Sequence, residues 1–172
     1  MSGEAPIYIV PYDALWPGTF ETERALLAGA IGEWLAGPIE HIGSTAVPGL
    51  AAKPVIDIMA GVESLDASRP ALAALEPHGY CHAPYRADVM HWLCKPSPAF
   101  RTHHLHLVPL HSRLWIERLA FRDHLRAHPD VAREYAALKT RLADAHRLDR
   151  ERYTDAKAPF VQRVLDEALR SR

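Results

Sequence analysis

The chain is poor in cysteine, in long apolar runs and in net charge, and each shortage excludes a class of protein. Cys81 and Cys94 are the only cysteines among 172 residues, too few for the disulfide framework of a small secreted domain. No apolar run approaches the roughly 20 residues that a membrane-spanning helix needs. Residues 1–6 have neither the basic nor the apolar stretch of a signal peptide. We therefore expect a cytoplasmic protein.

The charge balance also argues against one class of partner. The chain has 20 Lys and Arg against 21 Asp and Glu, so it lacks the strong positive field typical of a nucleic-acid-binding protein. Its length fits one domain spanning residues 1–172, and 48% apolar residues are enough for a sizeable core. The 11 histidines gather mostly between residues 78 and 128, so local chemistry matters more than net charge.

A central stretch, residues 38–62, has two apolar runs around a loop rich in Gly, Pro, Ser and Thr. The runs 39–42 and 55–62 are typical of two strands joined by a turn. The second run contains a lone carboxylate, Asp57, which is costly to bury unless it is paired or binds a cation. The Gly43-Ser44 pair before it offers backbone N–H groups and a hydroxyl, which suit a phosphate.

The remaining elements follow from hydrophobic spacing and from the positions of proline and glycine. The pattern predicts helices over residues 18–35, 68–78, 112–128, from 130 onward and 152–169, and strands over 7–10, 80–85, 89–95 and 102–110. Pro159 should kink the last helix or mark its start. We expect an α+β fold, with a mixed sheet in residues 1–110 and C-terminal helices in 111–172.

Several strings resemble one family. Residues 41–58 read His-Ile-Gly-Ser-Thr-Ala-Val-Pro-Gly-Leu-Ala-Ala-Lys-Pro-Val-Ile-Asp-Ile, and residues 101–108 read Arg-Thr-His-His-Leu-His-Leu-Val. Both strings, together with residues 119–129, 134–139 and 153–157, look like the hallmark of GrpB family proteins. The resemblance places the chain in the nucleotidyltransferase superfamily by fold. It implies a mixed sheet with helices packed on it and a Gly-Ser turn before a strand that bears metal-binding carboxylates.

The candidate catalytic and metal site comprises Asp57, His104 and His106. Residues two apart on a strand face the same side, so both imidazoles project together and His103 projects the other way. One carboxylate and two imidazoles suit a transition ion such as Zn²⁺ or Mn²⁺ better than Mg²⁺, which prefers oxygen ligands. The alternative is that the two imidazoles satisfy buried polar groups or form a hydrogen-bonded cluster with Asp57.

The strand departs from the superfamily pattern in one respect. A two-metal nucleotidyltransferase needs an acid-x-acid pair, because two cations must be held a few ångströms apart. The positions two before and two after Asp57 are Val55 and Met59, which cannot bind a hard cation. Substrate phosphates would then have to supply the missing oxygen ligands to a single divalent ion.

A second set of residues is suited to phosphate. The turn and its lysine offer N–H groups, hydroxyls and a cation, while basic and aromatic residues in the family-like strings could close over a bound anion. The candidates are Gly43, Ser44, Thr45, Lys53, Arg101, Arg122, Lys139, Tyr153 and Lys157. The alternatives are a tight turn whose hydroxyls bond their own backbone and solvated helix faces with ordinary ion pairs.

Three functions remain open from the sequence. The leading one is an enzyme that uses a divalent metal to transfer a nucleotidyl or phosphoryl group to a small acceptor. The second is a regulatory module that binds a nucleotide or a coenzyme A-like anion without catalysis, and the third is a metal-dependent hydrolase. The expected partner is a nucleotide or another phosphorylated small molecule, not a nucleic acid or a membrane. Apolar residues near both ends fit either internal packing or a homodimer interface.

Overall fold

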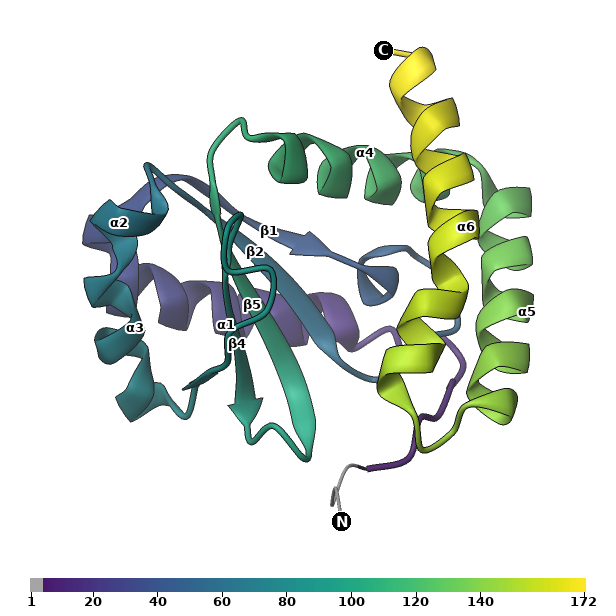
Figure 1. Ribbon diagram of the computed structural model, residues 1–172, viewed down its shortest axis with the longest axis horizontal. Coiled ribbons are helices and arrows are strands. Elements are labelled where there is room, and N and C mark those ends of the chain that lie inside the picture. Colours follow the sequence, from purple (N-terminus) through teal and green to yellow (C-terminus); the bar gives the residue numbers. More distant parts are fainter. Residues whose placement is uncertain (1–4) are drawn as a thin grey trace.

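A mixed sheet forms the centre of the molecule in the computed structural model, which describes residues 5–172 (Figure 1). Within this range the sheet has five strands in the spatial order β1-β2-β5-β4-β3. Their bounds are β1 Leu35–Ile42, β2 Ile56–Val62, β3 Cys81–His82, β4 His91–Pro96 and β5 Arg101–Pro109. β2 and β5 run parallel, and the other neighbouring strands run antiparallel. The sequence-based expectation of an α+β fold with a mixed sheet is confirmed.

Helices cover both faces of this sheet (Figure 1). One face packs against α1 (Trp16–Ile31) and α3 (Pro70–Leu75), which follows the short α2 (Leu65–Ser68). The other face lies toward α4 (Arg113–Ala127), α5 (Pro129–Ala145) and α6 (Arg150–Arg170). Three 3₁₀ turns, η1 (Gly32–Trp34), η2 (Ser44–Ala46) and η3 (Glu76–His78), complete the order. No helix among residues 5–172 combines the length and apolarity needed to cross a bilayer.

The pairing of the parallel strands β2 and β5 determines which side chains of the candidate site are neighbours. Asp57 lies opposite His104 in the register, and Met59 lies opposite His106. Because side chains alternate along a strand, these positions face the C-terminal helices. The intervening Ile58 and its neighbours on β5 face α1.

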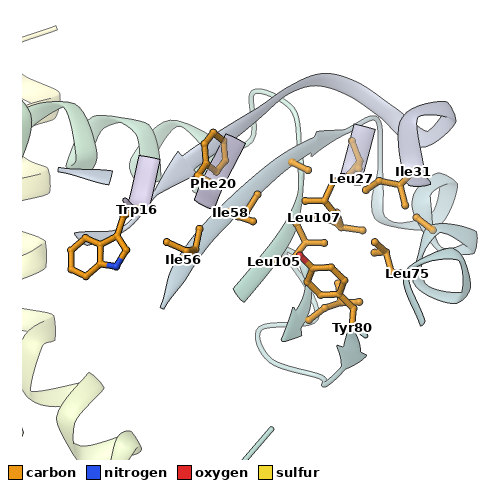
Figure 2. Packing of buried hydrophobic residues seen from close by; sticks show 14 of the residues in the cluster. Trp16, Phe20, Leu27, Ile31, Ile56, Ile58, Leu75, Tyr80, Leu105 and Leu107 are labelled. Atoms are coloured by element: carbon orange, nitrogen blue, oxygen red, sulfur yellow. The ribbon is translucent and has the colours of Figure 1, made fainter. Parts of the chain in front are cut away.

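The α1 side of the sheet holds a large apolar core (Figure 2). Leu27 and Ile31 of α1 pack with Ile58, Leu105 and Leu107 of the sheet, and all five are fully buried. Full burial of such a side chain contributes about 1.5–3 kcal/mol. This layer fixes the strand register and therefore the position of every side chain on the opposite face.

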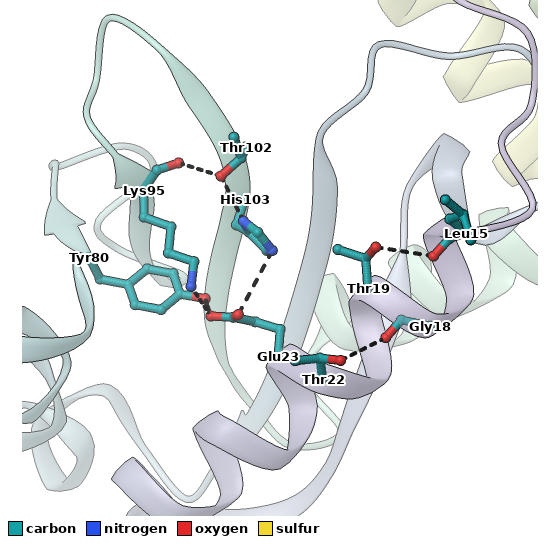
Figure 3. A network of polar contacts seen from close by, with 9 residues as sticks. All are labelled: Leu15, Gly18, Thr19, Thr22, Glu23, Tyr80, Lys95, Thr102 and His103. Atoms are coloured by element: carbon teal, nitrogen blue, oxygen red, sulfur yellow. Dashed lines mark hydrogen bonds and ion pairs between the residues drawn. The ribbon is translucent and has the colours of Figure 1, made fainter.

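A buried polar network crosses the same layer (Figure 3). The Glu23 carboxylate of α1 accepts hydrogen bonds from the Tyr80 hydroxyl at 2.7 Å and from Lys95 Nζ at 2.5 Å, and it lies 3.8 Å from His103 Nε2. Burial alone would raise the pKa of Glu23, but the bonds from Lys95 and Tyr80 hold that pKa below its usual value. The network therefore keeps a charged carboxylate in the core and ties α1 to β4 and β5.

Three predicted strands differ in extent from what the sequence pattern indicated. Residues 7–10 form a single bridge between Val10 and Ala52, and the strand predicted over 80–85 is reduced to Cys81–His82. Pro84 has no N–H to donate to a ladder, which explains the early end of β3. The strand predicted over 89–95 starts at His91.

Two predicted helices also differ in extent. The helix predicted over 18–35 starts at Trp16 and stops at Ile31, because Leu35 already pairs with Val62 in the sheet. The helix predicted over 68–78 is divided into α2, α3 and η3 around Pro70, which starts α3 at a position where proline is favoured. Pro159 lies inside α6 and does not end it.

Candidate functional site

A cavity of about 840 Å³ lies between the Asp57 face of the sheet and helices α4, α5 and α6. Most of the residues proposed from the sequence line it, namely Gly43, Ser44, Thr45, Lys53, Asp57, Arg101, His104, His106, Lys139, Tyr153 and Lys157. Seven Lys and Arg side chains and four Asp and Glu side chains line the cavity. This local excess of positive charge contrasts with the net charge of −1 for the whole chain.

Asp57 lies on the floor of the cavity with both predicted histidines beside it. His104 Nδ1 is 2.9 Å from Asp57 Oδ1, and His106 Nε2 is 3.6 Å from the same oxygen. Burial alone would raise the pKa of Asp57, but the hydrogen bonds from His104 and His106 hold it well below its usual value. Burial lowers the pKa of His106. The floor therefore carries an ionised carboxylate between two imidazoles.

The loop before β2 approaches Asp57 closely. Gly43 has φ 72°, and a Cβ placed on it would lie 2.5 Å from Asp57 Oδ2, so only glycine fits without displacement. Ser44 interacts with the Tyr135 hydroxyl of α5, which partly offsets the rise that burial causes in the pKa of Tyr135. Thr45 Oγ1 lies 2.9 Å from Nε2 of His41, whose pKa burial lowers to about 4. The loop is thus fixed from both sides.

Three lysines from separate parts of the chain lie close together, two of them over the Tyr153 ring and Lys139 over the Tyr135 ring. We call Lys53, Lys139 and Lys157 the lysine cluster. Lys53 Nζ is 5.2 Å and Lys157 Nζ 4.4 Å from the centre of the Tyr153 ring, and Lys139 Nζ donates to the Ala51 carbonyl at 2.6 Å. Burial and mutual repulsion lower the pKa of both Lys139 and Lys157 to about 7. Within residues 5–172 neither of these two lysines forms an ion pair with an acid, although buried cations are normally paired.

Two polar atoms of cavity-lining residues are buried without a partner. They are the Tyr153 hydroxyl and His104 Nε2, the only such side-chain atoms among the described residues. Burial raises the pKa of Tyr153, which keeps the hydroxyl protonated. Most buried polar groups in proteins have a hydrogen-bond partner, so these two atoms indicate a place for a ligand.

Several cavity residues were not assigned to the site from the sequence. Arg118 of α4 lines the cavity, and burial lowers its pKa. Arg150, at the start of α6, also lines it and donates to the carbonyls of Pro98 and Ala99, both at 3.0 Å. Arg118 and Arg122 are four residues apart and so share a helix face, but this spacing does not show which of the two arginines faces the cavity.

Arg122 is the one proposed phosphate ligand that does not line the cavity. Its guanidinium donates to Glu40 at 2.6 Å, to the His41 carbonyl at 3.1 Å and to Asp123 at 2.9 Å. Glu40 and Asp123 hold the guanidinium in place where α4 passes over β1. Arg122 thus links α4 to the sheet, and its sequence-based assignment to the anion site is withdrawn.

Comparison with known proteins shows to which family the chain belongs. Residues 6–167 match the family described as GrpB protein. The chain belongs to this family. The glutamate-rich protein GrpB of Alkalihalophilus pseudofirmus is 37% identical over 166 residues, which cover 94% of this chain and 95% of that protein.

Solved structures agree with the GrpB assignment. The crystal structure of the conserved protein GrpB from Enterococcus faecalis superposes with a TM-score of 0.86 at 34% identity, covering 95% of this chain and 98% of that one. A chain of the GLD-2/RNP-8 complex gives a TM-score of 0.52 at 14% identity, covering 91% of this chain and 60% of that one. The second likeness concerns the fold alone, and it confirms the predicted nucleotidyltransferase-like architecture.

The side chains around Asp57 in this GrpB chain offer few atoms that could coordinate a divalent ion. No group of three or more His, Cys, Asp or Glu side chains within the described range is arranged to hold a metal. His104 directs Nδ1 at Asp57, and His106 directs Nδ1 toward Met90 Sδ at 3.4 Å. Asp57 Oδ2 is the oxygen left for a cation, so the residues fit a divalent ion only if a ligand's phosphate oxygens complete its coordination.

Proposed function

We propose that the cavity binds a nucleotide or another phosphorylated small molecule, and that the chain transfers a nucleotidyl or phosphoryl group from it to a small acceptor. One observation carries the proposal, namely that Lys139 and Lys157, which form no ion pair with an acid within residues 5–172, share a cavity with Lys53 and the ionised Asp57. A carboxylate ligand would offer two oxygens, whereas a phosphate chain offers enough to reach all three lysines.

The lysine cluster and Arg118 would neutralise the ligand's phosphates. In a transfer reaction the negative charge grows on the leaving phosphate, so fixed cations there favour the transition state over the ground state. Ser44 and the unpartnered Tyr153 hydroxyl would donate hydrogen bonds to the same oxygens. These contacts need little reorganisation, because the side chains already line the cavity.

Asp57 and His104 would form the reacting pair. Asp57 Oδ1 accepts the hydrogen bond from His104 Nδ1–H, which leaves the lone pair on the unpartnered Nε2. Nε2 would take the proton from the acceptor hydroxyl, the acceptor oxygen would bond to phosphorus, and the bond to the leaving phosphate would break. A divalent ion held by Asp57 Oδ2 and the phosphates would supply further charge stabilisation.

The test is the unfolding midpoint of the purified protein with inorganic triphosphate, nucleotides and coenzyme A, each with and without Mg²⁺ or Mn²⁺. A ligand that binds only the folded state raises the midpoint. We expect a shift that needs both nucleotide and metal and is lost in Asp57→Asn. The matched control is Asp144→Asn, an exposed acid outside the cavity, which should keep the shift. No shift with any anion would overturn the proposal.

A second candidate, an anion-binding module without catalysis, is favoured by the apolar Val55 and Met59 on either side of Asp57. This module would bind a nucleotide or a coenzyme A-like anion with the lysine cluster alone. Asp57→Asn would then retain or strengthen anion binding, because the substitution removes a negative charge. A midpoint shift that needs no metal and survives Asp57→Asn would establish this second function. The hydrolase alternative is less well supported, since His104 and His106 both approach Asp57 rather than a shared empty point.

A further inference from the structure

The cavity has two chemically different ends. The lysine cluster, with Tyr153, occupies one end, where α6 begins. The other end is formed by the loop before β4 and by the facing turns of α4 and α6. We call this second region the aromatic end and define it by Tyr85, Trp92, Leu114, Val161 and Leu165.

Tyr85 is the exposed aromatic residue of this end. The residue is 49% exposed although it lines a cavity, and its ring meets the Trp92 ring edge to face at 6.3 Å. The Arg101 guanidinium lies over Trp92 at 5.0 Å. An exposed tyrosine ring backed by a buried indole and an arginine plane is a surface on which a flat group can stack.

The space beyond the aromatic end continues outward and has a mixed lining, with apolar side chains beside the charged Arg86, Arg113 and Glu117. Leu114, Val161 and Leu165 line both the main cavity and an adjoining hollow of about 560 Å³, which also includes Arg86. The main cavity alone has the volume of sites that hold drug-sized molecules, about 300–1,000 Å³. A phosphate group at the lysine cluster would leave most of this volume empty.

We propose that the ligand has two parts, with its phosphates at the lysine cluster and a planar aromatic group against Tyr85 at the opposite end. This inference rests on the proposed function and narrows it from phosphorylated molecules in general to nucleotides and other phosphorylated heteroaromatic compounds. A sugar phosphate or an inorganic polyphosphate has no planar aromatic group to place against Tyr85. The reacting pair, Asp57 and His104, lies on the cavity floor that both parts share.

The experiment compares ATP with inorganic triphosphate by titration calorimetry in the presence of Mg²⁺ or Mn²⁺, because the two carry similar phosphate chains and only ATP has a base. We expect wild-type protein to bind ATP at least about fivefold more tightly, since a base stacked on an aromatic side chain contributes about that much or more. Tyr85→Ala should remove most of this advantage and leave triphosphate binding unchanged. Tyr85→Phe, which keeps the ring, should retain the advantage.

Tyr8→Ala is the matched control, because Tyr8 is 54% exposed and lies outside the cavity; it should bind ATP as wild type does. Equal affinity of wild-type protein for ATP and triphosphate would overturn this inference and leave the proposed function standing. ATP affinity that is unchanged in Tyr85→Ala would also overturn it. Failure of both compounds to bind would overturn the proposed function together with the inference.

Discussion

His104 Nδ1 lies 2.9 Å from Asp57 Oδ1, across the parallel strands β5 and β2. The contact depends on the backbone register, because the two residues are direct neighbours in the ladder. A slip of one residue would turn either side chain to the opposite face. The apolar core under α1 therefore positions the acid and the imidazole together.

Gly43→Ala should destabilise the protein and displace the Asp57 carboxylate. The new methyl group would meet Oδ2 at 2.5 Å, at a φ of 72° that alanine rarely adopts. We expect a loss of about 1–3 kcal/mol in the free energy of unfolding, measured by urea denaturation. Gly29→Ala in α1 is the control, since a Cβ there meets nothing within 4 Å; it should be neutral or stabilise by up to about 1 kcal/mol. Equal effects at both positions would contradict the close approach.

The ligand-free protein should gain stability as the pH rises from about 7 toward 9.5. The pKa of Lys139 and of Lys157 is lowered from 10.5 to about 7 in the folded state. Between these values the unfolded chain binds more protons than the folded one, so the free energy of unfolding increases with pH. A rise of at most about 6 kcal/mol is expected for the two groups together, and burial raises the pKa of nearby Tyr135 to about 12, outside this window.

A urea denaturation series across that pH range measures the rise. The double variant Lys139→Met, Lys157→Met removes both groups and should flatten the slope. Arg141→Gln, an exposed substitution on the same helix as Lys139, should keep the wild-type slope. A double variant with an unchanged slope would show that other groups cause the pH dependence.

Glu23→Ala should be among the most destabilising single changes. It would leave Lys95 as a buried cation with no carboxylate and the Tyr80 hydroxyl without its 2.7 Å acceptor. Removing one partner of a buried pair costs about 3–5 kcal/mol, which denaturant titration would detect. Glu21→Ala is the control from the same helix, because Glu21 is 57% exposed and pairs with the exposed Arg24; its cost should be at most about 1 kcal/mol.

Arg118→Met and Arg122→Met should separate anion binding from scaffold stability. Arg118 lines the cavity and has no hydrogen bond or ion pair within residues 5–172, so its loss should weaken triphosphate binding and leave stability unchanged or increased. Arg122 links Glu40 to α4, so its loss should cost about 1–3 kcal/mol and leave the affinity of the folded protein intact. Denaturation and calorimetry on both variants check this pair, and the reverse assignment of effects would contradict the site.

The strands that carry the candidate site were predictable because side-chain alternation is a local property. His104 and His106 fall on one face by their spacing alone, and the apolar runs around Asp57 mark β2. Arg122 was not predictable in the same way. Residues four apart share a helix face, but the direction of that face depends on how α4 crosses β1, which is a tertiary property.

The burial of Lys139 could not be predicted from the sequence either. Lys139 is 2% exposed, although lysine is among the residues least often buried. Its burial results from the packing of α5 against the loop before β2, where the Ala51 carbonyl receives its ammonium group. Hydrophobic spacing predicted the helix, but it contained no information on the loop that would cover this side chain.

Arg150 joins the first turn of α6 to the β4–β5 turn through two carbonyl bonds. Because the sheet and α6 lie far apart along the chain, the cavity has no complete wall until this late segment docks. Ligand binding should therefore slow amide hydrogen exchange in α6 more than in α1, whose contacts do not depend on that docking. Ligand affinity should therefore depend on α6 being docked against the rest of the molecule.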